Sequence, residues 1–306
     1  MGELNSSMVS WQISRFCAKA NISDPIVIAS IPTYAKVALS LRRTALFYKR
    51  SDFHSAFVGV DTHLIGELEE TLFQHADAVL YANEYLFKAE QRRTKKGILI
   101  GHGVDRSLFQ PEGLAAADLK DLPRPRVGFF GELRDRCIDF ELIAAAAHLL
   151  PSIQFVLGGT QFEDLGELRT LSNVRVLPAC AHYQVPERWR AVDVAILPYR
   201  KNAYSLAVEP VKLNEILAMG LRAVGTSIPA LEQHPGTVEI ADGPEAFATA
   251  LHRLLTEEAG TDAKMREFRR ATLNLRTWES VADQIEGILR RTVSTDASTS
   301  SKMAGS

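Results

Sequence analysis

The sequence predicts an α/β fold made of two Rossmann-like, doubly wound domains that face one another across a cleft. With 306 residues, of which 46% are hydrophobic, the chain is long enough for two domains of ordinary size. Short apolar runs alternate with helical patterns along most of the chain, which is typical of parallel sheets. A polar stretch that ends with Pro123 and Pro125 interrupts this alternation. The two series on either side of it indicate two domains.

The first series begins with a polar helix and then alternates between strand and helix. Short apolar runs bounded by turn residues are typical of buried strands, and the longer segments between them have helical spacing. Strands are expected at 26–30, 45–48, 78–81 and 97–101. Helices are expected at 10–20, 34–42, 62–75 and 84–92.

The second series follows residues 121–126, which contain both prolines and are the predicted linker. Strands are expected at 127–130, 153–157, 174–177, 194–197, 223–225 and 238–240, with helices between them and closing helices at 244–256 and 264–291. The predicted domains are therefore 1–122 and 123–293. Residues 294–306 are small and polar without periodicity, so a disordered tail is expected there.

Composition excludes several classes of protein. A formal net charge of −2 provides no field that attracts nucleic acid. The three cysteines, Cys17, Cys137 and Cys180, have no C-x-x-C spacing, so they suggest neither a disulfide framework nor a zinc site and fit a reducing, cytoplasmic location. No apolar run is long enough to span a bilayer. Peripheral contact with a membrane stays open.

The most informative segment is 207–220, AVEPVKLNEILAMG. Pro210 suits the first position of a helix and Gly220 suits the position just after its end. The free N–H groups near Val211 to Leu213 carry the positive end of the helix dipole, and Lys212 adds a full charge beside them. Glu215 lies on nearly the same face, where its carboxylate can accept hydrogen bonds from sugar hydroxyls. The segment predicts a site for a diphosphate and a sugar.

A second interpretation of the same segment is an amphipathic helix with a solvated Lys212–Glu215 pair. The context favours the binding site, because apolar runs of buried-strand type precede and follow the helix, at 193–200 and 222–229. A helix between parallel strands presents its N-terminus at the carboxyl edge of the sheet, where open α/β folds bind ligands.

Seven short motifs resemble, in order and spacing, those of the GT-B glycosyltransferases, in particular the group-1/family-4-like retaining enzymes. They are SDFH at 51–54, HADAVLYANEYL at 75–86, HGVDRSLF at 102–109, GFFGEL at 128–133, SNVRVLPA at 172–179, DVAILPY at 193–199 and EPVKLNEILAMGLRAVGT at 209–226. The last helix, with Trp278, also resembles the family's closing helix, which tends to cross back onto the first domain.

The resemblance implies a role for residues of the second domain in binding the donor. Gly131 would let the backbone approach the phosphates, Arg134 would pair with them, and Tyr183 would stack on the base. Lys212 and Glu215 would contact the diphosphate and the ribose. An ordinary turn glycine, a solvated loop arginine and a surface tyrosine remain the alternatives for Gly131, Arg134 and Tyr183.

The chain departs from the family pattern at several places. The family often has a carboxylate eight residues before the position of Glu215, where this chain has Ala207. Glu209 is a carboxylate at a different spacing from Glu215. The residue that contacts the donor sugar is therefore in question. The first domain lacks the strand, Gly-rich loop and long helix with which family members usually begin. Asp52 and His54 follow its second expected strand and would orient the acceptor or support the leaving phosphate. A turn residue and a satisfied histidine remain their alternatives.

These observations predict a metal-independent glycosyltransferase without a cofactor, with Lys212, Asp52 and His54 as catalytic residues. No Asp-x-Asp sequence is present to hold a divalent ion. The expected donor is a UDP- or GDP-sugar, and the acceptor a polysaccharide, a lipid-linked glycan or a small molecule. The alternatives are an inactive nucleotide-sugar-binding or scaffold relative and a nucleotide-sugar epimerase or phosphorylase. Because the first domain is short, weak or absent transfer is expected until an upstream strand is restored.

Overall fold

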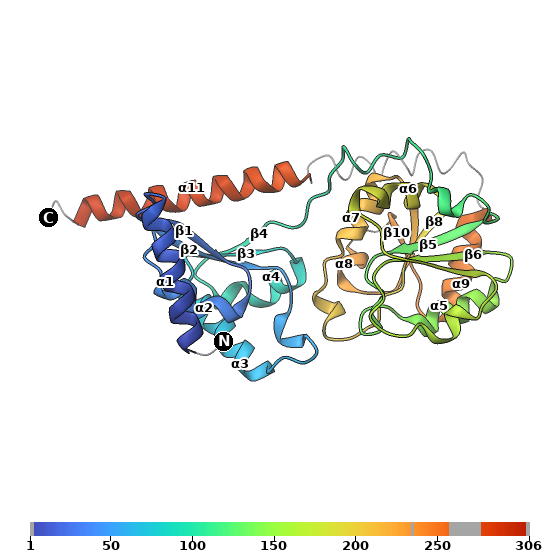
Figure 1. Cartoon of the computed structure of the whole chain (residues 1–306), viewed down its shortest axis with the longest axis horizontal. Coiled ribbons are helices and arrows are strands. Elements are labelled where there is room, and N and C mark those ends of the chain that lie inside the picture. The colour runs from blue at the N-terminus through green and yellow to red at the C-terminus, as the bar shows by residue number, and fades with distance from the viewer. Residues whose placement is uncertain (1–2, 234–235, 257–276, 304–306) are drawn as a thin grey trace. The chain divides into compact units, whose positions relative to one another are not determined.

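The chain divides into two compact units (Figure 1). The computed structural model describes residues 3–233, 236–256 and 277–303, with side chains as far as Val293. Unit 1 comprises Met1–Gly101, Ala207–Glu209 and Glu279–Ser306, and unit 2 comprises His102–Leu206 and Pro210–Trp278. The division after Gly101 precedes the predicted linker, and the last helix belongs with unit 1.

Unit 1 contains a four-stranded parallel sheet in the order β1-β2-β3-β4. The strands are β1 (Ile26–Ala29), β2 (Ala45–Arg50), β3 (Ala78–Tyr81) and β4 (Gly97–Leu99). Right-handed crossovers that advance in one direction place their helices on one face of a sheet. Here α2 (Ala35–Ser40), α3 (Thr62–His75) and α4 (Glu84–Glu90) share one apolar core with the sheet. In the described part of unit 1 the strands therefore advance in one direction only, with the crossover helices on one face.

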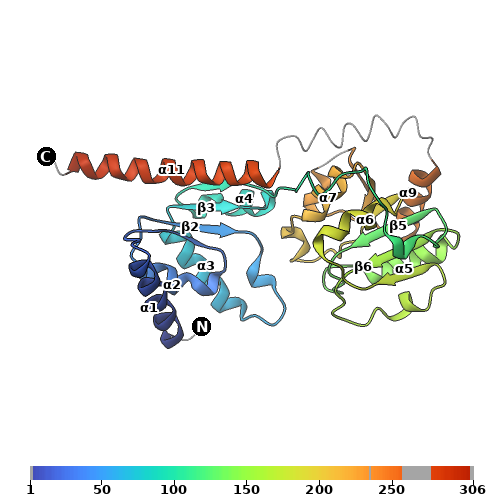
Figure 2. The ribbon, with the colours of Figure 1, turned by 45° about the horizontal axis from the view of Figure 1, so that its top comes forward.

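The opposite face of this sheet is covered by α11 (Trp278–Met303), which runs along it in both views (Figures 1 and 2). Ile285, Ile288 and Leu289 of α11 pack with Phe47 and Leu80 of the sheet. The predicted disordered tail at 294–306 is wrong over 294–303, where the helix continues. Extending an existing helix costs little, because each added residue gains a hydrogen bond. Residues 304–306 and the predicted helix start at Lys264 lie outside the described residues.

Helix α1 (Glu3–Lys19) has small polar residues on its inner side and large apolar residues on its outer side. Ser10 contacts Ser40 of α2 through their hydroxyl oxygens, 2.6 Å apart. Leu4, Met8 and Trp11, spaced at i, i+4 and i+7, are exposed. The edge strand β1 also leaves Ile28 43% exposed. Unit 1 thus presents apolar surface on α1 and at the free edge of its sheet.

Unit 2 contains a six-stranded parallel sheet in the order β10-β9-β8-β5-β6-β7. The strands are β5 (Arg126–Phe130), β6 (Gln154–Gly158), β7 (Val174–Leu177), β8 (Val194–Leu197), β9 (Arg222–Gly225) and β10 (Val238–Ile240). The helices are α5 (Phe140–Leu149), α6 (Val185–Arg190), α7 (Val211–Ala218), α8 (Pro229–Glu232) and α9 (Pro244–Thr256). The strand order reverses between β5 and β8, so this sheet is doubly wound as predicted.

Short 3₁₀ helices complete the described elements. They are η1 (Pro32–Tyr34), η2 (His54–Ala56), η3 (Gln91–Arg93), η4 (Ala117–Leu119), η5 (Gly166–Arg169), η6 (His182–Gln184) and η7 (Ser205–Ala207). The predicted strands are confirmed, each within two residues at its ends, because apolar runs bounded by turn residues mark buried strands clearly. Helix α1 begins at Glu3 rather than near Ser10; Leu4, Met8 and Trp11 have helical spacing that extends this far toward the N-terminus.

Asn173, from the SNVRVLPA motif, ties the end of α5 to the sheet. Its side chain is buried, and its Nδ2 group donates to the carbonyls of Ala147, Leu150 and Ile153 at 2.9, 3.2 and 3.2 Å. Buried carbonyls need such partners, because an unsatisfied polar group costs folding free energy.

Replacing Asn173 should therefore destabilise the protein. We expect Asn173→Ala to lower the free energy of unfolding by about 1–3 kcal/mol, the cost of unsatisfied buried groups. Asn173→Asp should cost more, because a carboxylate cannot donate and would face three carbonyl oxygens. Urea unfolding measures both, with the exposed Ser172→Ala as the control. An Asp variant as stable as the Ala variant would contradict this account of Asn173.

Candidate functional site

A cavity of about 270 Å³ lies in unit 2 at the carboxyl ends of β5, β6 and β7, beside the point where the strand order reverses. Doubly wound sheets bind ligands at this position. The N-terminal turn of α7 closes one side of the cavity. The lining residues are Phe130, Gly131, Glu132, Gly158, Gly159, Thr160, Ala179, Cys180, His182, Val185, Arg188, Val211, Lys212 and Glu215.

Two glycine turns bring the backbone close to this cavity. The Gly131 N–H donates to the Gly158 carbonyl at 2.8 Å, so the loops after β5 and β6 pack together. Gly159 has a φ of +149°, and a Cβ there would overlap the Gly131 carbonyl oxygen. A Cβ on Gly131 would instead overlap Cε of Lys212. Sequence reasoning selected Gly131 but missed Gly159, although a glycine pair directly after a buried strand is a recognisable turn signal.

Helix α7 begins one residue later than predicted. Pro210 has an extended conformation, with φ −70° and ψ 110°, and is the N-cap rather than the first helical residue. Its carbonyl accepts a hydrogen bond from the Leu213 N–H at 2.9 Å, so the prediction of a free Leu213 amide is wrong. The amides of Val211 and Lys212 remain at the end of the helix that lines the cavity. Gly220 has a φ of +65° and ends the helix as predicted.

Lys212 extends its side chain over Gly131. Its Nζ lies 5.5 Å from the centre of the Phe129 ring and makes no hydrogen bond or ion pair with any residue that the structure describes. Burial lowers the pKa of Lys212, and the nearby Glu215 and Glu132 carboxylates offset part of this shift. A partly buried cation without a partner at the wall of a cavity is a binding group for an anion.

Glu215 lies one turn further along α7 and is only 7% exposed. The interpretation of Lys212 and Glu215 as a solvated surface pair is therefore wrong, because neighbouring elements cover this face of the helix. Burial raises the pKa of Glu215, whereas Lys212 and His182 lower it. Trp189 of α6, fully buried and edge-on to Phe130 with 4.7 Å between ring centres, anchors the neighbouring wall in the core.

Three other predicted residues of the donor site do not line this cavity. Arg134 pairs with Glu132 at 2.8 Å and stacks on the Phe162 ring, 3.2 Å from its centre. Tyr183 is 69% exposed on η6. Glu209 belongs to unit 1. Arg134 and Tyr183 lie just after residues that line the cavity, and Glu209 lies just before one. Sequence position alone does not show which of such neighbours turns inward.

Sequence reasoning missed most of the polar lining. Arg188 of α6 is buried, and its Nη1 donates to the Pro178 carbonyl at 2.7 Å while Nη2 lies 3.4 Å from an Asp118 oxygen. His182 precedes the predicted Tyr183 and packs against Phe109, with 5.4 Å between ring centres. No spacing rule marks Arg188 or His182, because tertiary contacts bring both to the cavity.

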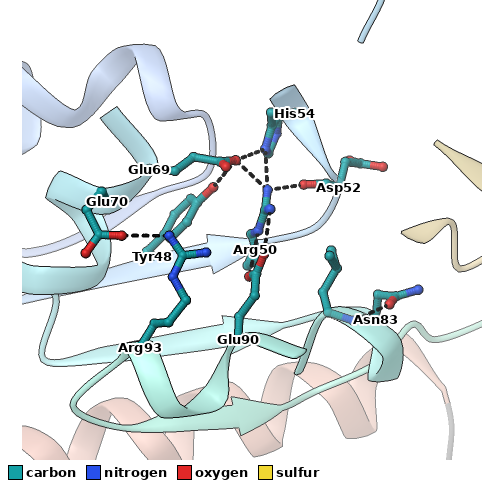
Figure 3. A network of polar contacts seen from close by, with 10 residues as sticks. Tyr48, Arg50, Asp52, His54, Glu69, Glu70, Asn83, Glu90 and Arg93 are labelled. Carbon is teal, nitrogen blue, oxygen red and sulfur yellow. Dashed lines mark hydrogen bonds and ion pairs between the residues drawn. The ribbon is translucent and has the colours of Figure 1, made fainter. Parts of the chain in front are cut away.

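Asp52 and His54 lie in unit 1, in the loop after β2. The Asp52 carbonyl accepts a hydrogen bond from Arg50, and His54 Nδ1 lies 3.2 Å from Arg50 Nη1 and 3.4 Å from a Glu69 oxygen (Figure 3). The two predicted residues are thus held by one buried polar network.

A larger cavity, of about 500 Å³, lies elsewhere in unit 2, beside the N-termini of α5 and α9. Its Lys201 and Asp242 pair with each other at 2.5 Å, so these charges are already satisfied. The smaller cavity, with its unpartnered lysine, is the better candidate for a charged ligand. In the described part of the chain, no group of three or more His, Cys, Asp or Glu side chains is arranged to hold a metal ion.

Comparison with known proteins assigns this part of the chain to a family. Residues 124–257, which include the cavity, match the family model described as "Glycosyl transferases group 1". This segment is a group 1 glycosyltransferase domain. The chain is also 27% identical over 262 residues to TuaH of Bacillus subtilis (strain 168), a predicted teichuronic acid biosynthesis glycosyltransferase. The match covers 78% of this chain, and the chain spans 65% of the length of that relative.

Solved structures show that the fold is that of GT-B glycosyltransferases. Sucrose-phosphate synthase from Thermosynechococcus elongatus superposes with a TM-score of 0.73 at 20% identity, covering 94% of this chain and 78% of that one. HepE from Anabaena, solved with UDP and glucose, superposes with a TM-score of 0.73 at 17% identity, covering 94% and 83%. None of the helices that the structure describes is long and apolar enough to cross a membrane.

The two glycines of the glycosyltransferase domain should respond differently to a methyl group. At Gly159 an added Cβ would meet the backbone of Gly131, and the φ of Gly159 is positive. We therefore expect Gly159→Ala to lower the melting temperature. At Gly131 the obstacle is the end of a flexible side chain, so Gly131→Ala should displace Lys212 with little loss of stability.

Thermal unfolding with and without UDP measures both effects. Gly131→Ala should weaken the stabilisation by UDP while the unliganded melting temperature stays near that of the parent. Gly243→Ala, at a φ of +81° with no atom near the added Cβ, controls for backbone strain alone. Equal losses of melting temperature in the Gly131 and Gly159 variants would refute the distinction.

Proposed function

We propose that this protein is a glycosyltransferase that transfers a sugar from a nucleotide-diphosphate donor to a hydroxyl group of an acceptor. The observation that carries the proposal is the unpartnered Lys212 side chain, which lies over Gly131 at the N-terminal end of α7 in the cavity of the group 1 domain. A diphosphate placed there would supply the anion that Lys212 lacks.

Among nucleotide donors, the comparisons favour a UDP-sugar, because HepE is solved both with UDP and with UDP-glucose. A GDP-sugar remains the second donor to test. Glu215 would accept hydrogen bonds from the ribose hydroxyls. The nearby Lys212 charge favours the ionised form of Glu215, which can accept them. Arg188 and His182 line the cavity, so we assign to them the contacts that the sequence suggested for Arg134 and Tyr183.

In the proposed reaction, the bond between the sugar's anomeric carbon and the diphosphate oxygen breaks while an acceptor oxygen bonds to that carbon and releases its proton to solvent. Negative charge develops on the leaving diphosphate. Lys212 and the amides of Val211 and Lys212 would stabilise this charge, because fixed dipoles and cations aimed at developing charge lower the barrier. We propose that they do so without a divalent ion.

For the acceptor side, we propose a glycan under construction, polymeric or lipid-linked, because TuaH is assigned to the synthesis of a polysaccharide. Asp52 and His54 of unit 1 would orient the accepting hydroxyl. We also propose a cytoplasmic location, which suits the free thiols of Cys17, Cys137 and Cys180.

A protein that binds the donor without turnover is the second candidate. Leu4, Met8 and Trp11 on α1 are exposed apolar side chains, and such a surface is often a contact site for another polypeptide. A protein that binds a donor and a partner polypeptide, without transferring sugar, would use both features. Donor binding without release of UDP from UDP-glucose would identify this second function.

A thermal-shift screen against nucleotides and nucleotide sugars tests the proposal. A ligand at about one hundred times its Kd should stabilise the protein by roughly 2.7 kcal/mol. We expect a shift with UDP and UDP-glucose that survives excess EDTA. The absence of a shift with every UDP and GDP species would refute both candidate functions, and a shift abolished by EDTA and restored by Mn²⁺ would refute metal independence.

Lys212→Ala should weaken UDP binding by about 1.5–3 kcal/mol, the range for a hydrogen bond to a charged group. Stability should change little, because Lys212 has no partner among the described residues. Isothermal titration calorimetry measures the affinity, and the exposed Lys120→Ala serves as the control.

The same titrations at rising pH add a second test. Because burial lowers the pKa of Lys212, its charge is lost at a lower pH than for an exposed lysine. A bound diphosphate favours the charged form, so binding takes up a proton and the affinity of the parent falls as the pH rises. The Lys212→Ala variant should lose this fall. Equal affinities for the variant and the parent would remove Lys212 from the site.

A further inference from the structure

Arg50, the last residue of β2, lies at the centre of a buried polar network in unit 1 (Figure 3). Its side chain is 0% exposed. Nε and Nη2 form a two-pronged contact with Glu90, at 3.1 and 3.0 Å, and Nη1 donates to Glu69 at 2.5 Å. Glu69 comes from α3 and Glu90 from the end of α4, so the guanidinium connects two helices to the carboxyl edge of the sheet.

The network also holds the loop at residues 51–57, which follows β2. Arg50 Nη1 donates to the Asp52 carbonyl and lies 3.2 Å from His54 Nδ1. His54 Nδ1 in turn lies 3.4 Å from a Glu69 oxygen, and its ring packs against Phe57 with 5.5 Å between centres. Asp52 and His54 of the loop are therefore held by Arg50 of β2 and by Glu69 of α3.

Stability alone does not account for this arrangement. Taking one cation and two carboxylates out of water is costly, and apolar side chains of similar volume would stabilise the unit as well. Tyr48, whose pKa is raised by burial, keeps its proton and donates to Glu69 at 3.3 Å, adding a further polar contact to satisfy that carboxylate. A planar guanidinium with five donors fixes the orientation of each group that it contacts. Apolar packing does not do this.

The Asp52 carboxylate is the part of the loop that the network leaves available. Only the carbonyl of Asp52 contacts Arg50, and Figure 3 shows the carboxylate pointing away from the guanidinium. It forms no hydrogen bond with the residues that the structure describes. Asp52 also lies just beyond the carboxyl end of β2, at the sheet edge where α/β folds bind ligands.

We propose that Arg50, Glu69 and Glu90 are positioning residues: they hold loop 51–57 so that the Asp52 carboxylate keeps one orientation toward a hydroxyl-bearing acceptor. The three residues do not touch the acceptor themselves. Their role rests on the proposed glycosyltransferase function, in which Asp52 and His54 orient the accepting hydroxyl.

Two pairs of variants test this role against matched controls. Arg50→Lys keeps the charge but removes the two-pronged contact, and Glu69→Gln removes one carboxylate charge. Arg93→Lys and Glu70→Gln make the same changes in a neighbouring pair, 2.6 Å apart, whose side chains are 49% and 43% exposed. Glu69 and Glu70 are adjacent in sequence, but the Arg93–Glu70 pair is exposed and does not contact loop 51–57.

The first measurement is amide hydrogen exchange of the 306-residue chain without ligand. We expect exchange at residues 51–57 to rise about tenfold or more in Arg50→Lys and Glu69→Gln while the amides of β2 and β3 keep their protection, because local opening exposes only the released segment. The control variants should match the parent. Unchanged exchange at 51–57, or an equal rise throughout unit 1, would overturn the positioning role. If Arg50→Lys does not fold, Glu69→Gln alone decides.

The second measurement is the release of UDP from UDP-glucose in the presence of a panel of free sugars as acceptors, with UDP affinity measured by calorimetry. Arg50→Lys and Glu69→Gln should lower acceptor-dependent kcat by about ten- to hundredfold, the usual cost of a misplaced reacting group. UDP affinity should stay within about twofold, because the described residues that line the donor cavity all belong to unit 2. A fall in UDP affinity of the same size as the fall in kcat, or full activity in Arg50→Lys, would overturn the proposal.

The two measurements also separate the positioning role from the proposed function. If the parent binds no UDP or GDP species and releases neither nucleotide from its sugar donor, the glycosyltransferase proposal fails, and the acceptor part of this inference fails with it. The exchange experiment still decides whether Arg50 and Glu69 hold the loop. If the parent is active and exchange at 51–57 rises without any loss of kcat, the function stands and the positioning role is overturned.

Discussion

The side chain of Lys212 lies in the space that Gly131 leaves by having no Cβ, and the candidate donor site is built around this contact. The contact requires β5 and β8 to be neighbours in the sheet, since Gly131 follows β5 and α7 follows β8. The contact also requires the loops after β5 and β6 to pack together. Gly159 permits this packing, because it has no Cβ that would overlap the Gly131 carbonyl oxygen. The result is a cation held at the end of a helix, with its charge directed to a cavity rather than to a carboxylate.

The two units bury charge in opposite ways. Arg50 in unit 1 is surrounded by carboxylates and a carbonyl, so its charge is balanced within the protein and the groups around it are held in place. Lys212 in unit 2 has no such partner among the residues that the structure describes, and burial lowers its pKa. An internally balanced cation stabilises a geometry, whereas an unbalanced one gains free energy when an anion arrives. This difference explains why we assign positioning to the first and binding to the second.

Unit 1 depends on a helix from the far end of the chain. Its strands advance in one direction, so their crossover helices cover one face, and the other face would be open without α11. Ile285, Ile288 and Leu289 supply the missing apolar layer. The same one-directional order leaves β1 as an edge, with Ile28 partly exposed, and α1 carries its largest apolar residues outward. Apolar surface of this kind is where further polypeptide would pack.

The sequence by itself determined the strands, most helices and the presence of Gly131, Lys212 and Glu215 at the candidate site, because these depend on local signals. Apolar runs define strands, Gly220 ends α7, and the spacing of Lys212 and Glu215 places both on one helix face. It did not determine that Arg134 turns toward Phe162 while Arg188 reaches the cavity, or that His182 rather than Tyr183 lines it. Nor did it show that Arg50 joins Glu69 and Glu90 from two different helices around Asp52 and His54. These contacts join residues far apart in the chain, and only the packing of strands and helices decides which side chains meet.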